Sequence, residues 1–528
     1  MRWLPLLPLL AYLAPLSSAE TKRLGRRGIL PGARKVTRWV LLVIPLIVVL
    51  IFTVVLVRVA GFRSHQVAAP PMSDIAVDEA LVAQHLATAI SIPTVARGPG
   101  DVDTEALRRL QAALAEMFPA THRSLHREVV ADYSLLYRWN GTDPSLRPIV
   151  LLAHLDVVPV EPGIDSAWKV PPFEGRIADG FVWGRGARDD KSSLIAILEA
   201  VETLLDRGFQ PRRTIYLAFG HDEEVGGLAG GRKLAEVLTS RNIKAALLLD
   251  EGAGITRNIV PGLAAPVASV AIAEKGYLTV ELTVDLPGGH ASVPPPQSAI
   301  GVLAAALTRL EAHPMPRRLD GPTRASLDTL GREMSFPKRL VFANLWLFGG
   351  LVERQAARVP ATDALTHTTT AATIFEGGIK DNVLPSHVRA VLNFRILQGD
   401  TIAGVLDHVR RVVGDGRVSI RATGGCQSEP SPLSDTSGPA FALCARTIRQ
   451  VFHDAIVVPT VAAVMTDARH YAQVSGAIYR FEPQVLTSDD LPQIHGTDER
   501  ISVAELATGV RFYAQFLLNT TGPEAPSF

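Results

Sequence analysis

Cysteine is scarce in this sequence of 528 residues, and neither sign of charge dominates it. Two cysteines, Cys426 and Cys444, are too few for a cysteine-rich metal site or a disulfide framework, although one bridge between them is compatible with an oxidising compartment. A formal net charge of +1 provides no broad basic surface, so nucleic acid is not an expected partner. The length favours two folded domains with accessory segments over one compact unit.

The N-terminus carries two apolar segments. Residues 3–15 follow Arg2 and precede small residues, which resembles a signal peptide, and residues 39–57 form an uncharged run long enough to span a bilayer. Seven basic residues separate the segments, whereas only Arg58 and Arg63 follow closely, so the positive-inside rule places the bulk of the chain outside the cytosol. A cleaved signal before this anchor would leave the remainder in the cytosol, but the charge asymmetry carries more weight. We expect a secreted, extracellular or lumenal protein with residues 39–57 as a single-pass signal anchor.

Residues 1–72 therefore hold the signal-like segment, the anchor and a linker, and the soluble part begins near Ser73. Two Asn-x-Thr triplets begin at Asn140 and Asn519 in this soluble part. They are compatible with glycosylation in a lumenal or extracellular location, although such triplets also arise by chance.

From residue 148 the sequence alternates apolar strand runs with amphipathic stretches of helix length. The expected strands are 149–153, 214–219 and 245–249, and the expected helices are 192–207 and 230–240. The strand runs are apolar on both faces, as in a buried, mainly parallel sheet. This pattern predicts an α/β catalytic domain made of residues 73–275 and 424–528.

The pattern changes near Gly276 to that of a small α+β domain. The expected elements are a strand at 277–284, a helix at 298–312, two strands around 382–395 and a helix from Ile402. We expect residues 276–423 to form an inserted, ferredoxin-like lid domain over the catalytic domain.

Histidines and acids follow the expected strands, where ligands bind in such sheets. His154 and Asp156 come after the first strand, and because positions two apart on an extended chain face the same way, the carboxylate can orient a metal-bound imidazole. An ordinary hydrogen-bonded histidine at a strand end is the competing interpretation. Glu223 and Glu224 follow the second strand in a run of acids that would repel one another without cations. Glu251 follows the third strand.

A glycine-rich turn at 184–188 delivers Asp189 and Asp190 just before an expected helix. A carboxylate has two oxygens and can hold two cations at once, so Asp189 is the candidate bridging ligand. Asp190 is the candidate N-terminal cap of the helix. With His495 near the C-terminus, these histidines and acids form a nitrogen and oxygen ligand set that favours zinc, with manganese or cobalt as alternatives.

The joint order of these motifs resembles that of the zinc aminoacylase and carboxypeptidase family. The motifs are His154-x-Asp156, Gly-Arg-Gly-Ala-x-Asp-Asp-Lys, Asp-Glu-Glu, Asp-Glu-Gly and the late His-Gly. The resemblance covers roughly residues 73–518 and is closest to the branch that forms and hydrolyses N-fatty-acyl amino acids. It implies a di-zinc, aminopeptidase-like catalytic domain. Residues 465–470 depart from the family, whose members usually have glycine before Thr-Asp and serine in place of Ala468.

The resemblance also implies a role for each site residue. Two zinc ions would be held by His154, Asp189, Glu224, Glu251 and His495, with Asp189 bridging them. Asp156 would orient a ligand, Glu223 would act as the general base, and His290 of the lid would help to hold the reacting carbonyl oxygen. Asn382 and Arg395 would bind the substrate carboxylate, although they also suit a turn and a strand edge.

The expected function is hydrolysis of the amide bond of N-(fatty)acyl amino acids, together with the reverse condensation of fatty acid and amino acid. A dipeptidase or carboxypeptidase on the same metals is one alternative, and a catalytically inactive binding protein on this fold is another. The expected partners are these small molecules and the membrane, and a homodimer is compatible with the sequence. Residues 336–352 are apolar enough to line a pocket for the fatty chain, to touch a membrane, or to form ordinary lid core.

Overall fold

The computed structural model describes residues 31–163 and 167–526, and it describes side chains from residue 42 onward. The chain divides into two compact units, Met1–Phe62 and Arg63–Phe528. The predicted signal-like segment, 3–15, lies outside the described residues. The first unit contains helix α2 (Pro31–Gly61), whose segment Leu42–Gly61 is long and apolar enough to cross a membrane by length and composition.

A ten-stranded mixed sheet forms the centre of the second unit. Its strands are β3 (His126–Val130), β4 (Ser134–Trp139), β5 (Ile149–His154), β8 (Ile215–Gly220), β9 (Leu247–Asp250), β10 (Ile255–Thr256), β11 (Val267–Glu274), β18 (Ile456–Ala462), β19 (Ile478–Arg480) and β20 (Val485–Leu486). The pairs β8–β5, β5–β9 and β9–β19 at its centre are parallel, whereas β3–β4 and β4–β8 on one side are antiparallel. The predicted α/β fold is confirmed, with parallel pairing at the centre of the sheet.

Both faces of the central sheet are buried, which explains why its strands read as continuous apolar runs. In β5, the side chains of Ile149 and Leu151 belong to one core cluster and those of Val150 and Leu152 to another. Helices α3 (Glu79–Ile90), α4 (Thr104–Met117), α6 (Lys191–Asp206), α14 (Pro439–Val451) and α15 (Val503–Thr521) contribute to the first cluster, and α7 (Gly231–Ser240) contributes to the second. Burial of about 100 Å² of apolar surface stabilises the fold by roughly 2.5 kcal/mol, so these two clusters hold the sheet in place.

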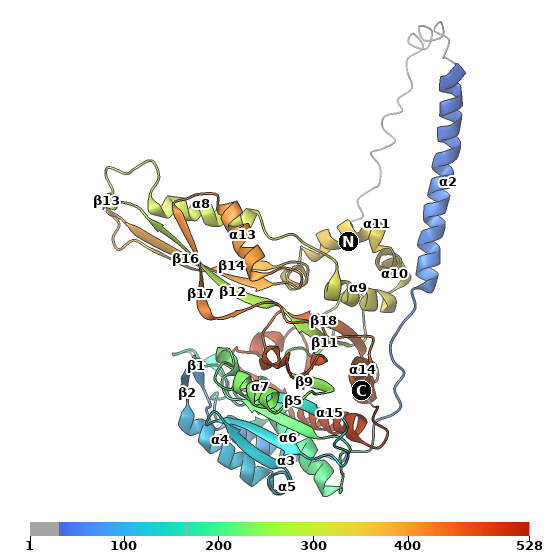
Figure 1. Cartoon of the computed structure of the whole chain (residues 1–528), viewed down its shortest axis with the longest axis vertical. Coiled ribbons are helices and arrows are strands. Elements are labelled where there is room, and N and C mark those ends of the chain that lie inside the picture. The colour runs from blue at the N-terminus through green and yellow to red at the C-terminus, as the bar shows by residue number, and fades with distance from the viewer. Residues whose placement is uncertain (1–30, 164–166, 527–528) are drawn as a thin grey trace. The chain divides into compact units, whose positions relative to one another are not determined.

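A second, four-stranded antiparallel sheet lies apart from the first (Figure 1). Its order is β14 (Thr369–Gly377), β16 (His387–Ile396), β12 (Gly276–Asp285) and β17 (Val418–Ser428). Helices α8 (Ala299–Ala312) and α13 (Ile402–Val413) pack on it and share a separate apolar core. The β-α-β-β-α-β order of the main elements agrees with the ferredoxin-like arrangement expected for the lid, a name we use for β12 to β17. The predicted boundaries at 72/73, 275/276 and 423/424 remain predictions.

A helical insertion interrupts the lid between α8 and β14. It contains α9 (Gly321–Glu333), α10 (Phe336–Ala343), α11 (Leu345–Ala356) and α12 (Pro360–Asp363). The chain enters the lid through Lys275, a buried residue whose ammonium group donates hydrogen bonds to the carbonyl oxygens of Ala364 and His367, both at 2.8 Å. The end of the insertion is therefore fixed to the entrance of the lid.

Candidate metal centre and substrate cavity

The candidate metal ligands lie at one edge of the central sheet. Since β5, β8 and β9 are parallel neighbours, the loops after their carboxyl ends meet there. His154 ends β5, Glu223 and Glu224 form a short 3₁₀ turn after β8, and Glu251 follows β9. The sheet topology brings these three segments together, and Asp189 joins them from the turn before α6.

Asp189 uses its two carboxylate oxygens on two different histidines. Its Oδ1 lies 2.9 Å from Nε2 of His154, and its Oδ2 lies 3.0 Å from Nε2 of His495. Glu251 lies beside the first histidine, at 3.5 Å, and Glu224 beside the second, at 3.2 Å. The five predicted ligands thus form two groups that share Asp189, which is the arrangement that a bridging carboxylate requires.

The ring of His154 is oriented through its other nitrogen. Nδ1 lies 2.9 Å from the backbone carbonyl oxygen of Asp156, and because a carbonyl only accepts hydrogen bonds, this nitrogen carries the proton. In the neutral ring, Nε2 then has its lone pair directed toward the carboxylates. The Asp156 carboxylate accepts hydrogen bonds at 3.1 Å from the backbone amides of Glu223 and Glu224. Asp156 therefore positions the histidine by its main chain and the two glutamates by its side chain.

The glutamates of this cluster are held in an environment that penalises negative charge, whereas burial of Asp189 is outweighed by hydrogen bonds from His154 and His495, which lower the pKa of its carboxyl group. Burial raises the pKa of Glu224 to about 7 and that of Glu482 to about 8, and it raises the pKa of Glu223 and Glu251 well above the usual range. Hydrogen bonds to Asp189 and Glu224 raise the pKa of His495 to about 10. Such a cluster takes up protons unless cations replace them.

The residues present fit divalent metal ions. Two sets of potential ligand atoms, His154 with Asp189 and Glu224, and His154 with Asp190 and Glu251, each lie within 4.8 Å of one another. The buried oxygens Oε1 of Glu224 and Oδ1 of Asp190 have no hydrogen-bond partner among the residues that the structure describes. Each keeps a lone pair available, and imidazole with carboxylate is a donor set typical of zinc.

Asp190 corrects one expectation from the sequence. It occupies the N-cap position of α6, but its side chain makes no capping hydrogen bond. Instead, its Oδ2 accepts a hydrogen bond from the backbone amide of His154 at 3.3 Å. The buried Asp190 side chain therefore supports the position of His154 instead of capping the helix, and it belongs to one of the two candidate ligand sets.

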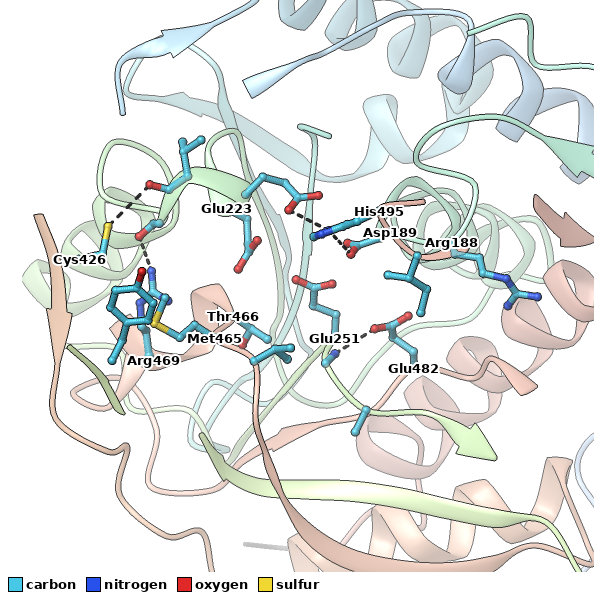
Figure 2. A pocket seen from close by; sticks show the side chains of 18 of the residues that line it. Arg188, Asp189, Glu223, Glu251, Cys426, Met465, Thr466, Arg469, Glu482 and His495 are labelled. Atoms are coloured by element: carbon cyan, nitrogen blue, oxygen red, sulfur yellow. Dashed lines mark hydrogen bonds and ion pairs between the residues drawn. The ribbon is translucent and has the colours of Figure 1, made fainter. Parts of the chain in front are cut away.

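A cavity of about 720 Å³ opens beside this cluster. Figure 2 shows Glu223 and Glu251 pointing into it near Asp189 and His495. Glu223 is only partly exposed and belongs to the cavity wall, as a general base must. Arg395 of the lid also lines the cavity, so the lid adds a cation to a wall that contains several acids.

The structure does not bring the other two predicted lid residues to this cavity. His290 lies in β13 (Gly289–His290), and its ring nitrogen Nδ1 is 2.7 Å from Oγ of Ser292. The carbonyl oxygen of Asn382 accepts a hydrogen bond from the backbone amide of Ala291 at 3.1 Å. His290 and Asn382 are therefore neighbours, but both are exposed and neither lines the cavity. Figure 1 places β13 at the tip of the lid, far from β5 and β9.

Several residues of the cavity wall were missed in the sequence, notably Tyr277, Cys426 and Arg469. Tyr277 follows directly after Lys275-Gly276, and Arg469 lies in the segment 465–470 that departs from the family pattern. That segment is bonded to the end of β9, because the amide of Ala468 donates to Oδ2 of Asp250 at 2.8 Å. Both cysteines are free thiols, Cys426 in the cavity wall and Cys444 in the core, so the bridge between them does not form.

The fold and the cluster of acids and histidines define a metal-dependent hydrolase. The family model for Peptidase family M20/M25/M40 matches residues 150–519, and the chain belongs to this family. It is 41% identical over 449 residues to the N-fatty-acyl-amino acid synthase/hydrolase PM20D1 of Mus musculus, covering 84% of this chain and 89% of that protein. It is 43% identical over 445 residues to the probable carboxypeptidase S-like 2 of Dictyostelium discoideum, covering 83% and 85%.

The fold is also that of solved structures. The M20 family metallo-carboxypeptidase Sso-CP2 from Sulfolobus solfataricus superimposes with a TM-score of 0.60 at 19% sequence identity, over 84% of this chain and 99% of that one. Human carnosine dipeptidase 1 gives a TM-score of 0.56 at 17% identity, over 83% and 96%. At these identities the likeness concerns the fold alone.

Proposed function

We propose that this protein hydrolyses the amide bond of N-(fatty)acyl amino acids and also catalyses the reverse condensation of fatty acid and amino acid. One observation carries the proposal: the guanidinium group of Arg395, a lid residue, lines the same cavity as Glu223 and the candidate metal ligands. An N-acyl amino acid carries a carboxylate next to its amide bond, and a guanidinium is the side chain best suited to bind it. The names of the relatives, N-fatty-acyl-amino acid synthase/hydrolase and carboxypeptidase, agree with such substrates.

Two zinc ions are the proposed cofactors. His154 and Glu251 would hold one ion, His495 and Glu224 the other, and Asp189 would bridge them. When bound, such ions lower the pKa of water and polarise a carbonyl group.

The residues of the chain supply the remaining chemistry. Arg395 binds the substrate carboxylate and so orients the amide bond toward Glu223. Glu223 accepts a proton from the attacking water while the oxygen of that water bonds to the carbonyl carbon. Glu223 then donates this proton to the amide nitrogen as the C–N bond breaks. Because no covalent enzyme intermediate forms, condensation is the same sequence in reverse.

His290 and Asn382 belong to the proposal as lid residues that complete the site. Since both lie at the tip of the lid, they reach the substrate only when the lid moves or when a second copy of the chain supplies them. The second route requires the homodimer. The edge strand β14 supports that state, because it exposes Ile374 and Phe375 next to an unpaired strand edge.

We also propose that α2 is a single-pass signal anchor and that the body of the protein lies outside the cytosol. The basic residues on the N-terminal side of the apolar run support this orientation. The bilayer is then a permanent partner of the chain.

The test is turnover of a long-chain N-acyl phenylalanine beside that of a dipeptide by the purified full-length protein with added zinc. Cleavage of the acyl amino acid alone, abolished by a chelator, is the expected result. Cleavage of the dipeptide alone would assign the protein to the peptidase alternative, which the carboxypeptidase relatives favour. No turnover and no zinc binding would leave only the inactive binding protein.

A further inference from the structure

Helices α10 and α11 of the insertion present large apolar side chains to the outside. The exposed fractions are 57% for Phe336, 54% for Trp346, 47% for Leu347 and 60% for Leu351. Ala343, Asn344 and Leu345 between them are buried and attach the two helices to the protein. We call the four exposed side chains the apolar face of the insertion.

The apolar face does not belong to the substrate cavity. None of its four residues lines that cavity, so it does not form a pocket for the fatty chain there. Its single polar atom is also satisfied, because the indole nitrogen of Trp346 donates to Oδ1 of Asn344 at 3.2 Å. What remains toward the outside is hydrocarbon, and a group of large apolar side chains on a surface marks an interaction site.

Basic residues accompany the apolar face. Residues 336–358 contain Lys338, Arg339, Arg354 and Arg358 and only one acid, Glu353. Short helices that combine an exposed tryptophan and leucines with lysine and arginine are typical of segments that lie in the headgroup region of a bilayer, where lipid phosphates accept hydrogen bonds from the basic side chains. Tryptophan is suited to this region because its ring is apolar and its N–H is polar.

Hydrogen bonds within the second unit tie the insertion to the segment that begins at Arg63. Arg332, in the last turn of α9, donates a hydrogen bond to the carbonyl oxygen of Arg63 at 2.8 Å. Three residues further on, the side chain of Gln66 bonds to both backbone groups of Val457, at 3.0 and 2.9 Å. The segment that begins at Arg63 is thus bonded to the rest of the second unit from its first residue onward.

Chain length then limits how far the insertion can lie from the bilayer. The apolar segment ends at Gly61, and the two residues to Arg63 reach at most about 7 Å. The extended side chain of Arg332 and its 2.8 Å hydrogen bond add roughly 10 Å, and the four residues from Arg332 to Phe336 add at most about 14 Å. These limits hold whatever the direction of α2.

We propose that the apolar face of the insertion rests in the headgroup region of the bilayer that α2 spans. The inference rests on the proposed function, because contact with the bilayer matters for an enzyme whose substrates carry fatty chains. Such substrates partition into the bilayer, and the contact brings the cavity close to them. The occupant of the apolar face is phospholipid, whose phosphate groups accept hydrogen bonds from the basic residues of the two helices.

The decisive experiment places a photocrosslinker on this face of the full-length protein, reconstituted in vesicles of phosphatidylcholine and phosphatidylserine. In the variant Leu351→benzoylphenylalanine, illumination is expected to give a covalent adduct with phospholipid. The matched control is Leu81→benzoylphenylalanine, since Leu81 is 46% exposed on α3, at the opposite end of the second unit (Figure 1). Absence of the lipid adduct at position 351, or an adduct only with a second copy of the chain, would overturn the proposal.

A kinetic experiment tests the consequence for substrate access. The double variant Trp346→Glu, Leu351→Glu is expected to lose roughly tenfold in kcat/KM on a long-chain acyl amino acid carried in these vesicles, and to keep its rate on a water-soluble N-acetyl amino acid. Leu81→Glu should change neither rate. Unchanged turnover of the vesicle substrate by the double variant would argue against docking. If the wild type cleaves neither substrate, the proposed function fails, and the crosslinking result still decides whether the face meets lipid.

Discussion

The guanidinium group of Arg395 lies 4.7 Å from the centre of the Tyr277 ring, and the two residues are direct partners on adjacent strands of the lid sheet. The ring thus holds the cation at the wall of the cavity. Stacking of this kind contributes about 0.5–1 kcal/mol and does not use the N–H groups at the edge of the guanidinium, of which Nε donates to Oδ1 of Asn393 at 3.2 Å.

Replacement of Arg395 by alanine should weaken substrate binding through the carboxylate. We expect Arg395→Ala to raise KM for N-acyl amino acids roughly 10- to 100-fold, because a hydrogen bond to a charged group contributes about 1.5–3 kcal/mol. Steady-state kinetics on an acyl amino acid and on its decarboxylated analogue measure this effect. Equal changes on both substrates would refute a role in carboxylate binding.

Tyr277 provides the matched control. Tyr277→Phe keeps the ring and should change KM less than Tyr277→Leu, which removes the surface on which Arg395 stacks. If the leucine variant behaves like the phenylalanine variant, stacking does not position Arg395.

Glu223→Gln should separate catalysis from metal binding. The variant keeps the shape of the side chain but cannot take a proton, so kcat is expected to fall about 100- to 10,000-fold while the zinc content remains that of the wild type. Glu224→Gln is the comparison, because this neighbour is a proposed ligand and its loss should lower the zinc content. Metal analysis together with kcat checks both, and near-normal turnover of Glu223→Gln would remove it from the role of base.

Lys275 makes stability depend on pH at the entrance of the lid. Burial lowers the pKa of its ammonium group to about 8, below its unfolded value of 10.5. Between these values the unfolded chain binds more protons than the folded one, so the free energy of unfolding should rise with pH over this window, by on the order of 3 kcal/mol from this group. Urea unfolding of wild type and Lys275→Met at both ends of the window isolates the effect. The free energy of unfolding of the variant should rise less with pH than that of the wild type. If the two proteins show the same rise, burial of Lys275 does not lower its pKa.

If the body of the protein lies outside the cytosol, the Asn-x-Thr triplet at Asn140 should be glycosylated and the triplet at Asn519 should not. Asn140 is exposed, whereas the amide nitrogen of Asn519 is half-buried and donates to Thr447 at 2.8 Å and to Gln450 at 2.6 Å. Asn140→Gln should therefore abolish the mobility shift that an endoglycosidase produces on the protein from secretory cells, and Asn519→Gln should not. A mobility shift that depends on Asn519 alone would mean that α15 is glycosylated before it packs. Absence of any mobility shift in the wild-type protein would argue against the lumenal orientation.

The central strands could be predicted because burial on both faces leaves a clear pattern. The sequence placed strands at 149–153 and 214–219, and the structure has β5 and β8 there with every residue buried. Strand β14 was not predicted, since it forms the edge of the lid sheet and most of its residues are exposed. An edge strand lacks the apolar pattern that identifies a central one.

The candidate site was predicted in its order along the chain but not in its geometry. Three of the five proposed ligands, His154, Glu224 and Glu251, lie at the ends of neighbouring parallel strands, so their convergence could be expected. Asp189 precedes α6 and His495 follows a 3₁₀ turn, so no strand end predicts where these two lie. The separation of His290 from the cavity could not be expected either, because it depends on how the lid stands over the catalytic domain. Likewise, no local pattern distinguishes Asp190 as a helix cap from Asp190 as a buried acceptor for His154.

The chain leaves and re-enters the catalytic domain at almost the same point, since Tyr277 at the start of the lid pairs with Ser428 at its end. The order of synthesis on the ribosome gives this arrangement a consequence. Leu248 of β9 cannot pair with Ile478 of β19 until the whole lid has been translated, whereas the lid is one continuous stretch with its own core. The lid is therefore expected to fold on the nascent chain first, and the central sheet can be completed only after β18, β19 and β20 have been synthesised.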